Sequence, residues 1–497
     1  MAQVSLTELS SAAMLNQDPS LTSKYDPRLG GVDPLGLRQI NFDLMDVVLP
    51  GLNNVASHIR PFTVVAWAWR RAATLARDLG QSSISVDVLR DFVDRIEVIY
   101  AWSQFQRKAD TDLPGRDYLA DLVKANQYTF GGESWRRRRE ARQYSTALSA
   151  PVNYGPGLKS LGWMQSDAGN SGALAVRGVA DEAIVAFEHE LGPCFSQPAL
   201  STLGEVTVTA SEVLELGEAW AIEHPTKSER TAFFNCLSGE HADPRRRSGI
   251  DLIISAVRHL DGNADPALVR KTMCGLPTTF AAPTYMEVTA KAWRILQVRQ
   301  VFRLALESLF HWVLLKLKAE PMITSALVDS FLCEAGDAET TELWFAEVGD
   351  DLRGPCDWLD ALRKALLSGK REMELPVVIR GALAVCIQEA PTTASDENNE
   401  RLPLSRAAKE ARSSVHSNPR TLMTHVLDSW VIGQHVFWSV NRGMGDARAG
   451  RRMILRLRIA LEEGGWALTP GSMIVIPNAT PDRLETALTL LRETGII

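Results

Sequence analysis

The chain has 497 residues, of which 45% are hydrophobic and 23% are charged. This composition is typical of a globular protein with a large core, and the length is typical of about two or three domains. The formal net charge of −7 argues against a protein that coats nucleic acid by bulk attraction, so binding to a polyanion would need local positive patches.

The cysteines and the N-terminal sequence indicate the cellular setting. There are six cysteines, and no two of them form a CxxC pair or another zinc-binding spacing. The first residues, MAQVSLTELSSAAML, lack the basic start and long apolar core of a signal peptide. No apolar run approaches the roughly 18 residues of a membrane span. We therefore expect a cytoplasmic protein with reduced thiols, no cofactor, no metal site and no membrane contact.

The N-terminal region begins with residues 1–24, which are rich in Ser, Thr and Gln and are predicted to form a flexible N-terminus. A Gly/Pro-rich break at 30–36 precedes apolar residues at three- and four-residue steps, which predict a helix over 37–48. Pro50-Gly51 separates this helix from a second predicted helix over 62–79.

Two short motifs lie in this stretch, DPLGL at 33–37 and LPGLNNVASHIRPF at 49–62, and PDRL at 481–484 is a fainter echo. They resemble segments of uncharacterised bacterial proteins encoded in phage-defence islands. The resemblance implies an antiviral, multi-protein setting but no particular activity. The polar residues of the second motif either line a binding surface or cap the two helices around it. These polar residues are Asn53, Asn54, His58 and Arg60.

The first arginine cluster follows predicted helices over 85–108 and 117–126. Its arginines suit contact with phosphates, and a neighbouring tryptophan offers a stacking platform for a base. The alternative is a solvated helix start whose arginines pair with acidic neighbours. The cluster consists of Arg136, Arg137, Arg138, Arg139 and Arg142, with Trp135 as the stacking residue.

Residues 149–177 contain many Gly and Pro residues and are predicted to be a long irregular connection, either functional or mobile. The helix predicted over 179–191 contains HEL, which superficially matches the start of the zinc motif HExxH. The second histidine position is occupied by Pro193, so no metal site is predicted there.

A second arginine cluster precedes a helix predicted over 249–260. The preceding helix begins with a predicted capping box from Thr226 to Glu229. Arginines at a helix start oppose the helix dipole, which indicates either an external anion or plain surface. The cluster consists of Arg245, Arg246 and Arg247.

The longest predicted helix covers 283–318 and is apolar on nearly all sides, so we expect it to be the buried spine of the middle region. Arg303 and Glu307 are placed for an i,i+4 ion pair. His311 is interpreted as a satisfied core histidine. Further helices are predicted over 325–335, 339–349, 355–368 and 375–389, before a polar and acidic linker over 390–402.

Residues 403–497 are predicted to form a winged-helix-like module. Two helices lead to a hairpin around Pro470–Ser472, and a last helix is predicted with Thr480 as its cap and Pro481 as its first residue. The GxG pattern at 443–450 invites a nucleotide-loop interpretation but lacks the preceding strand, so a flexible linker is the simpler interpretation. The third and densest arginine cluster is predicted to contact nucleic acid or an acidic protein surface. It consists of Arg448, Arg451, Arg452, Arg456 and Arg458.

The predicted fold is mainly α, with multi-helix N-terminal and middle regions and a small α/β winged-helix-like C-terminal module. The predicted segments are a flexible 1–24, helical domains over 25–148 and 149–389, the 390–402 linker and the 403–497 module. No P-loop, GxSxG or complete HExxH motif is present, so no catalytic residue is assigned.

We therefore expect a non-enzymatic scaffold or adaptor subunit that contacts other subunits, or double-stranded DNA, through its arginine clusters. Two alternatives stay open. One is an enzyme of unrecognised class with a site near the 53–60 and 149–177 loops. The other is a DNA-binding regulator.

Overall fold

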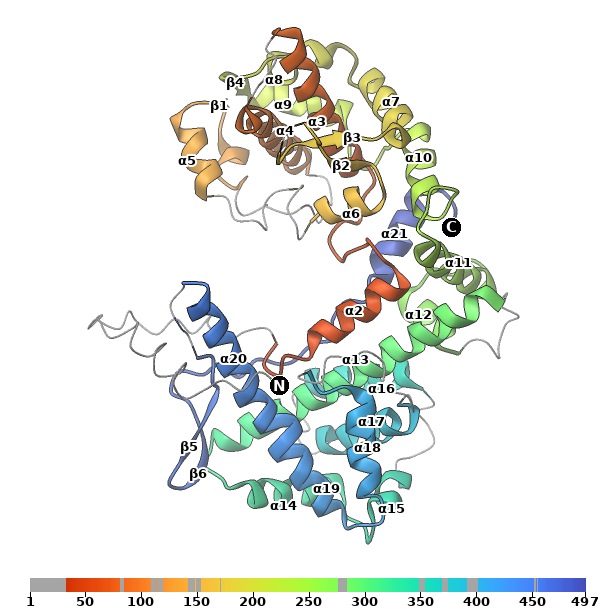
Figure 1. The fold of residues 1–497 in the computed structure, drawn as a ribbon, viewed down its shortest axis with the longest axis vertical. Helices are drawn as coiled ribbons and strands as arrows, with labels where there is room; N and C mark the ends of the chain where they lie inside the picture. Colours follow the sequence, from red (N-terminus) through yellow and green to blue (C-terminus); the bar gives the residue numbers. More distant parts are fainter. Residues whose placement is uncertain are drawn as a thin grey trace, which may run out of the picture. The chain divides into compact units, whose positions relative to one another are not determined.

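The computed structural model describes residues 33–80, 85–108, 113, 119–141, 148, 153–169, 171–275, 284–347, 354–368, 374–390, 401–450, 453 and 455–497. These residues are mainly helical, and their strands form three two-stranded antiparallel sheets (Figure 1). The predicted helical fold is therefore confirmed. Within these ranges, no helix has both the length and the apolarity of a membrane span. The predicted flexible N-terminus and most of the predicted linker lie outside the described residues.

The chain divides into two compact units, each built from segments that are distant in the sequence. Unit 1 contains the described residues up to Leu44 together with Lys291–Thr480. Unit 2 contains Met45–Ala290 and Pro481–Ile497. The predicted domain boundaries after residues 148, 389 and 402 each lie inside one of these units.

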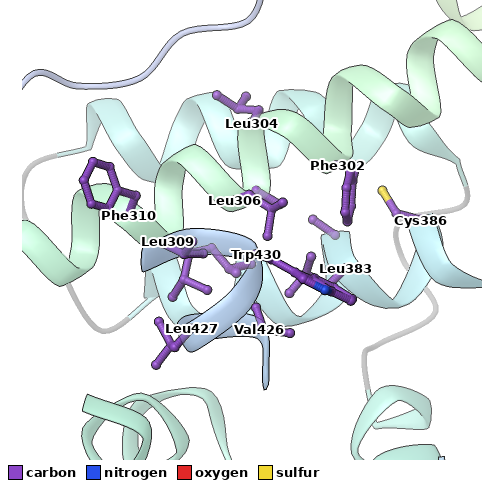
Figure 2. Close-up of a cluster of buried hydrophobic side chains, with 14 of the residues drawn as sticks. Phe302, Leu304, Leu306, Leu309, Phe310, Leu383, Cys386, Val426, Leu427 and Trp430 are labelled. Carbon is purple, nitrogen blue, oxygen red and sulfur yellow. The ribbon is translucent and has the colours of Figure 1, made fainter. Parts of the chain in front are cut away.

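Unit 1 is organised around α13 (Thr284–Leu317), which is buried over most of its surface from Val298 onward. The helices that follow it in this unit are α14 (Thr324–Ala335), α15 (Thr341–Ala346), α16 (Pro355–Leu367), α17 (Glu374–Glu389), α18 (Leu404–Ser413), α19 (Pro419–His425), the π-helical segment η7 (Val426–Gly433) and α20 (Gln434–Arg448). Figure 2 shows side chains of α13, among them Phe302 and Leu309, in one cluster with Leu383 and Trp430. An all-apolar helix must be covered on every side, and the predicted buried spine is confirmed.

The DPLGL motif forms a turn that docks on α20 within unit 1. His435 donates from Nδ1 to the carbonyl oxygen of Pro34 over 2.9 Å. Gly36 has φ +71°, and a Cβ atom on it would lie 2.2 Å from Cδ2 of Trp438. Glycine is therefore required both by the backbone conformation and by the tryptophan. Helix α2 (Arg38–Val48) begins directly after this turn.

The predicted C-terminal hairpin is wrong in its position. Strand β5 (Ile459–Glu462) pairs with β6 (Gly465–Leu468), and Pro470–Ser472 follow the hairpin instead of forming its turn. Trp466 of β6 also exchanges two backbone hydrogen bonds with Met322, of 2.9 and 3.0 Å. This long-range pairing fixes the strand position, and a local turn motif could not reveal it.

The last helix, α21 (Leu484–Thr494), belongs to unit 2, whereas the β5–β6 hairpin belongs to unit 1. It packs against α10 (Lys227–Leu237) and α12 (Pro266–Gly275). The residue before it is Arg483, with φ 67°, so the predicted cap at Thr480 and helix start at Pro481 are also wrong. A winged-helix module at the C-terminus is therefore not confirmed.

Unit 2 is built around two long helices, α3 (Arg60–Asp78) and α4 (Val86–Gln106), which pack side by side (Figure 1). Trp67 and Trp69, only two residues apart in α3, are both buried, so neighbours cover this helix on different sides. The further helices of unit 2 are α5 (Glu133–Ala141), α6 (Gly155–Ser160), α7 (Asp181–Leu191), α8 (Pro198–Ser201), α9 (Ala210–Ala219) and α11 (Pro244–His259), besides α10, α12 and α21.

Short elements join the helices of unit 2. The 3-10 turns are η3 (Leu122–Lys124), η4 (Gly178–Ala180) and η5 (Gly192–Ser196). Strand β1 (Gln127–Phe130) pairs with β4 (Val206–Thr209), and β2 (Met164–Ser166) pairs with β3 (Leu174–Val176). The described part of 149–177 thus contains α6 and a two-stranded sheet, which corrects the predicted irregular connection.

The LPGLNN motif makes hydrogen bonds that join separate segments of unit 2. The Oδ1 atom of Asn53 accepts from the backbone N–H groups of the second and third residues after it. Asn54 donates to the Pro481 carbonyl over 3.0 Å and accepts from the Arg483 N–H over 2.8 Å. The motif and its PDRL echo therefore meet, which favours a packing role for both asparagines over a binding surface.

Candidate functional site

The first predicted arginine cluster lies on α5, where acidic side chains already bind part of it. Arg138 pairs with Asp121. Arg139 pairs with Asp91 at 3.2 Å and with Asp94 at 2.7 Å. These two guanidinium groups join α5 to neighbouring segments of unit 2, so their charge is largely compensated.

The same helix leaves two arginines on the surface. Arg136 is exposed, and Arg137 makes an exposed i,i+4 pair with Glu133 at 2.5 Å. Such surface pairs are weak because water and salt screen them. Arg142 lies outside the described residues. The cluster therefore offers a few exposed cations instead of a continuous positive row.

Trp135 cannot serve as a stacking platform in this structure. Its side chain is 0% exposed, its Nε1 donates to Asp91 over 2.8 Å, and its ring meets Phe130 edge to face at 5.0 Å. A base can stack only on a ring face that solvent reaches. The predicted stacking role is corrected: this tryptophan anchors α5 in the core.

Arg246, in the second cluster, is a structural residue. It is 1% exposed and donates to the carbonyl oxygens of Leu237, Cys236 and Pro50 over 3.2, 2.7 and 3.1 Å, and to Oγ of Ser160 over 3.2 Å. Burial lowers its pKa, and nearby Asp243 opposes this effect. The predicted contact with an external anion is corrected, because carbonyl groups of the protein already enclose this guanidinium group.

The other two arginines of this cluster lie nearer the surface. The side chain of Arg245 is 63% exposed and lies 3.5 Å from Asp243. Arg247 donates to the carbonyl oxygen of Gly239. Asp243 also accepts from the first backbone N–H groups of α11. A carboxylate at the helix start thus offsets the unfavourable placement of arginines there.

The third cluster is only partly described, since Arg451 and Arg452 lie outside the described residues. Arg448 is exposed at the end of α20. Arg456 pairs with Asp446 at 3.1 Å. Arg458 is only 7% exposed, and its backbone N–H donates to Nε2 of His435 over 3.0 Å. The prediction that Arg458 contacts an outside macromolecule is corrected, because its side chain faces the interior of unit 1.

The loop at 53–60, the predicted site of the enzyme alternative, holds unit 2 together. His58 Nδ1 lies 2.5 Å from one carboxylate oxygen of Glu493, and the backbone N–H of Ile59 donates to the other oxygen over 2.7 Å. Tyr154 is buried with its ring edge-on to Phe62 at 4.8 Å. Each of these groups already has a partner within the fold.

Arg60 lies beside a polar cavity of about 560 Å³ in unit 2. It is 1% exposed and pairs with Glu190 at 2.8 Å and with Glu229 at 3.3 Å. The charged and imidazole groups that line this cavity are Glu190, Glu223, His224, Lys227, Arg230, Arg492 and Glu493. The cavity gathers carboxylates with the imidazole of His224, but none of these lining residues comes from the 53–60 or 149–177 loops that the enzyme alternative named.

The acids of this cavity already have partners within unit 2. Burial alone would raise the pKa of Glu223, but a backbone hydrogen bond and Arg107, 3.1 Å away, keep it below its usual value. Glu190 is bound by Arg60 and Glu493 by His58. A carboxylate whose pKa is lowered in this way, as in Glu223, is a weak general acid or base at neutral pH. In the described ranges, no group of three His, Cys, Asp or Glu side chains is placed to hold a metal ion.

No family model, curated protein sequence or solved structure is significantly similar to the chain. The resemblance of the short motifs to proteins of phage-defence islands therefore stays a prediction.

A cavity in unit 1 is lined by charged and imidazole side chains that lie far apart in the sequence. Arg458 lines it together with Arg38, Glu307 and His311. The predicted pair between Arg303 and Glu307 is confirmed at 2.7 Å. His311 is not fully satisfied, since its Nδ1 atom has no hydrogen-bond partner in the described part of the chain. The available signal was a row of polar residues at four-residue steps in an otherwise apolar helix.

Proposed function

We propose that the protein is a non-enzymatic scaffold or adaptor subunit of a bacterial multi-protein system, and that it contacts a protein partner through unit 1. The observation that carries this proposal is a set of large apolar side chains, between 41% and 69% exposed, along the C-terminal part of that unit. We call them the C-terminal surface residues. They are Phe437, Leu455, Leu461 and Met473.

The chemistry of this segment suits a protein surface better than a nucleic acid. Exposed large apolar groups often mark sites of protein association, and aromatic, Met and Arg side chains are enriched in interfaces. Arg448, exposed in the same segment, adds a cation for an acidic partner. The antiviral setting rests on the motif resemblance alone.

Contact with double-stranded DNA is the second candidate, supported by the exposed side chains of Arg136, Arg245 and Arg448. DNA affinity depends on how many phosphates are neutralised by uncompensated cations. Several predicted arginines, Arg245 among them, are paired with acids or buried, and the chain carries a net charge of −7. This balance favours a protein partner over DNA.

The partner hypothesis can be tested with the purified products of the neighbouring genes. We expect one of them to bind the full chain, and Leu461→Ser or Phe437→Ser to weaken binding about tenfold, as for central interface residues. The matched control is Leu343→Ser, which removes a leucine that is 50% exposed elsewhere in unit 1. Equal binding by all three variants would refute the proposed surface.

The DNA hypothesis is tested by the salt dependence of binding. If Arg448 contacts a phosphate, Arg448→Glu should lower the slope of log K against log salt by roughly one. Fluorescence anisotropy with a labelled duplex measures this slope. An unchanged slope, or no binding at low salt, would remove DNA as the partner of this residue.

A further inference from the structure

The cavity of unit 1 has a volume of about 280 Å³ and a largely apolar wall. Phe310 and Leu314 of α13 form one part of this wall, and Val475 and Ile476 form another. The two α13 residues are buried, whereas Val475 and Ile476 are 46% and 49% exposed. Pockets for drug-sized ligands measure roughly 300–1,000 Å³. The size therefore suits a small molecule whose apolar part packs against α13.

The polar part of the lining comes from three separate segments. Arg38 lies at the start of α2, Glu307 and His311 lie on α13, and Arg458 directly precedes β5. The lining thus carries two guanidinium groups and one carboxyl group, an excess of one positive charge when all three are ionised. Asp33, which accepts from the first backbone N–H groups near α2, adds a carboxylate close to Arg38. Arg303, which pairs with Glu307, adds a guanidinium group, so the excess of one positive charge remains.

Glu307 is buried in the cavity wall with only part of its bonding capacity used. Its Oε2 accepts from Arg303 over 2.7 Å, and its side chain is 1% exposed. Its Oε1 atom has no hydrogen-bond partner in the described ranges. Burial raises the pKa of Glu307, while the charges of Arg303 and Arg38 oppose this shift. A carboxylate ligand brings no donor for this oxygen, so its attraction to the cavity depends on the arginines of the lining.

His311 and Arg38 present further unused atoms at the same place. The Nδ1 atom of His311 and the Nε atom of Arg38 have no hydrogen-bond partner among the residues that the structure describes. Burial lowers the pKa of His311, a backbone hydrogen bond with Val475 opposes this shift, and the charge of Arg458 adds to it, so the ring is neutral near pH 7. A neutral imidazole can donate to a ligand or accept from it, depending on its tautomer.

We propose that this cavity binds a small monocarboxylate with an apolar body, with the carboxylate held by Arg38 and Arg458 and the apolar body packed against Phe310, Leu314 and Ile476. Arginine suits this role because its planar fork can bind both oxygens of a carboxylate. A monoanion matches the single excess positive charge. A phosphate dianion would place a second negative charge near Glu307, which disfavours it.

The two proposals rest on different residues, so either one can fail alone. The test uses isothermal titration of the purified full chain with phenylacetate. Phenylacetamide has the same shape without the charge, and inorganic phosphate has charge without an apolar body. We expect phenylacetate to bind with one site, phenylacetamide to bind at least about tenfold more weakly, and phosphate to give no saturable binding.

Two variants locate the binding in the cavity. Arg38→Gln should weaken phenylacetate binding about tenfold, whereas Arg245→Gln, on the surface of unit 2, should leave it unchanged. Ile476→Trp should block binding by filling the mouth of the cavity, and it alters a half-exposed residue that the fold can accommodate. Circular dichroism and thermal unfolding confirm that each variant is folded.

Three results would overturn the proposal. The first is equal affinity for phenylacetate and phenylacetamide, which would remove the role of the arginines. The second is unchanged phenylacetate binding by folded Arg38→Gln and Ile476→Trp proteins, which would place the ligand elsewhere. The third is the absence of saturable binding for both phenylacetate and hexanoate at millimolar concentration.

Discussion

Arg246 in unit 2 and Arg38 in unit 1 show two different uses of an arginine that the fold draws away from water. Arg246 donates to carbonyl and hydroxyl oxygens from several segments and is completely enclosed. Arg38 lines a cavity, and its Nε atom has no partner in the described ranges. Burial lowers the pKa of both. A buried arginine has a structural role when the chain supplies acceptors for its N–H groups. It is available to a ligand when some of its N–H groups have no acceptor.

The largest effect is expected from Arg246→Met. This change leaves the carbonyl oxygens of Leu237, Cys236 and Pro50 buried without their donor, so we expect a loss of about 3–5 kcal/mol in the free energy of unfolding. Urea unfolding measures it. Arg245 is exposed and directly precedes Arg246 in α11. Arg245→Met should therefore change stability by no more than about 0.5 kcal/mol. Similar losses for both variants would contradict the structural role of Arg246.

A second prediction concerns His435 of unit 1, whose two ring nitrogens both have hydrogen-bond partners, unlike the Nδ1 atom of His311. Burial lowers the pKa of His435 to about 4, the hydrogen bond to the Pro34 carbonyl opposes this shift, and the charge of Arg458 adds to it. The unfolded chain binds a proton below about pH 6.5, so the stabilisation is present above that pH and is lost as the pH falls towards 4, by about 3 kcal/mol in all.

The measurement is urea unfolding of the natural chain and of His435→Gln at pH 7 and pH 5. The difference in unfolding free energy between the two proteins should shrink by about 2 kcal/mol at the lower pH. His416→Gln is the control, because the side chain of His416 is 84% exposed. A difference that does not depend on pH would show that His435 is not held neutral.

Gly36 and Gly450 of unit 1 have similar positive φ angles but differ in the space around them. Gly36→Ala should destabilise by about 2–4 kcal/mol, because the added methyl group meets Trp438 at a backbone angle that favours glycine. Gly450 has a similar φ of +69° with open space around it, so Gly450→Ala should cost only about 1 kcal/mol. Thermal unfolding compares the two variants. Equal shifts would mean that Trp438 does not constrain the DPLGL turn.

The smallest effect is expected for Arg38→Met, the same substitution as in the Arg246 experiment. Because Arg38 contributes few hydrogen bonds to the fold, its loss should change the free energy of unfolding by about 1 kcal/mol or less, measured by urea unfolding. Proteins often keep binding residues at some cost in stability. A loss as large as that for Arg246→Met would mean that Arg38 is a structural residue.

Much of the helical framework could be predicted from the sequence alone. The capping box from Thr226 to Glu229 is present at the start of α10. The i,i+4 pair of Arg303 and Glu307 and the buried spine α13 are present as predicted. These features depend on residues within one or two helical turns, so local spacing is sufficient to predict them.

Whether a polar residue is buried, paired or exposed became clear only from the tertiary structure. The acceptors of Arg246 include Pro50, 196 positions away in the sequence, and Arg483 meets Asn54 across 429 positions. Trp135 looks like a surface residue beside its arginines, yet the core of unit 2 covers it. The cavity beside Glu307 exists because α2, α13 and the segment before β5 converge there. Burial and pairing depend on such distant partners, and no local pattern in the chain encodes them.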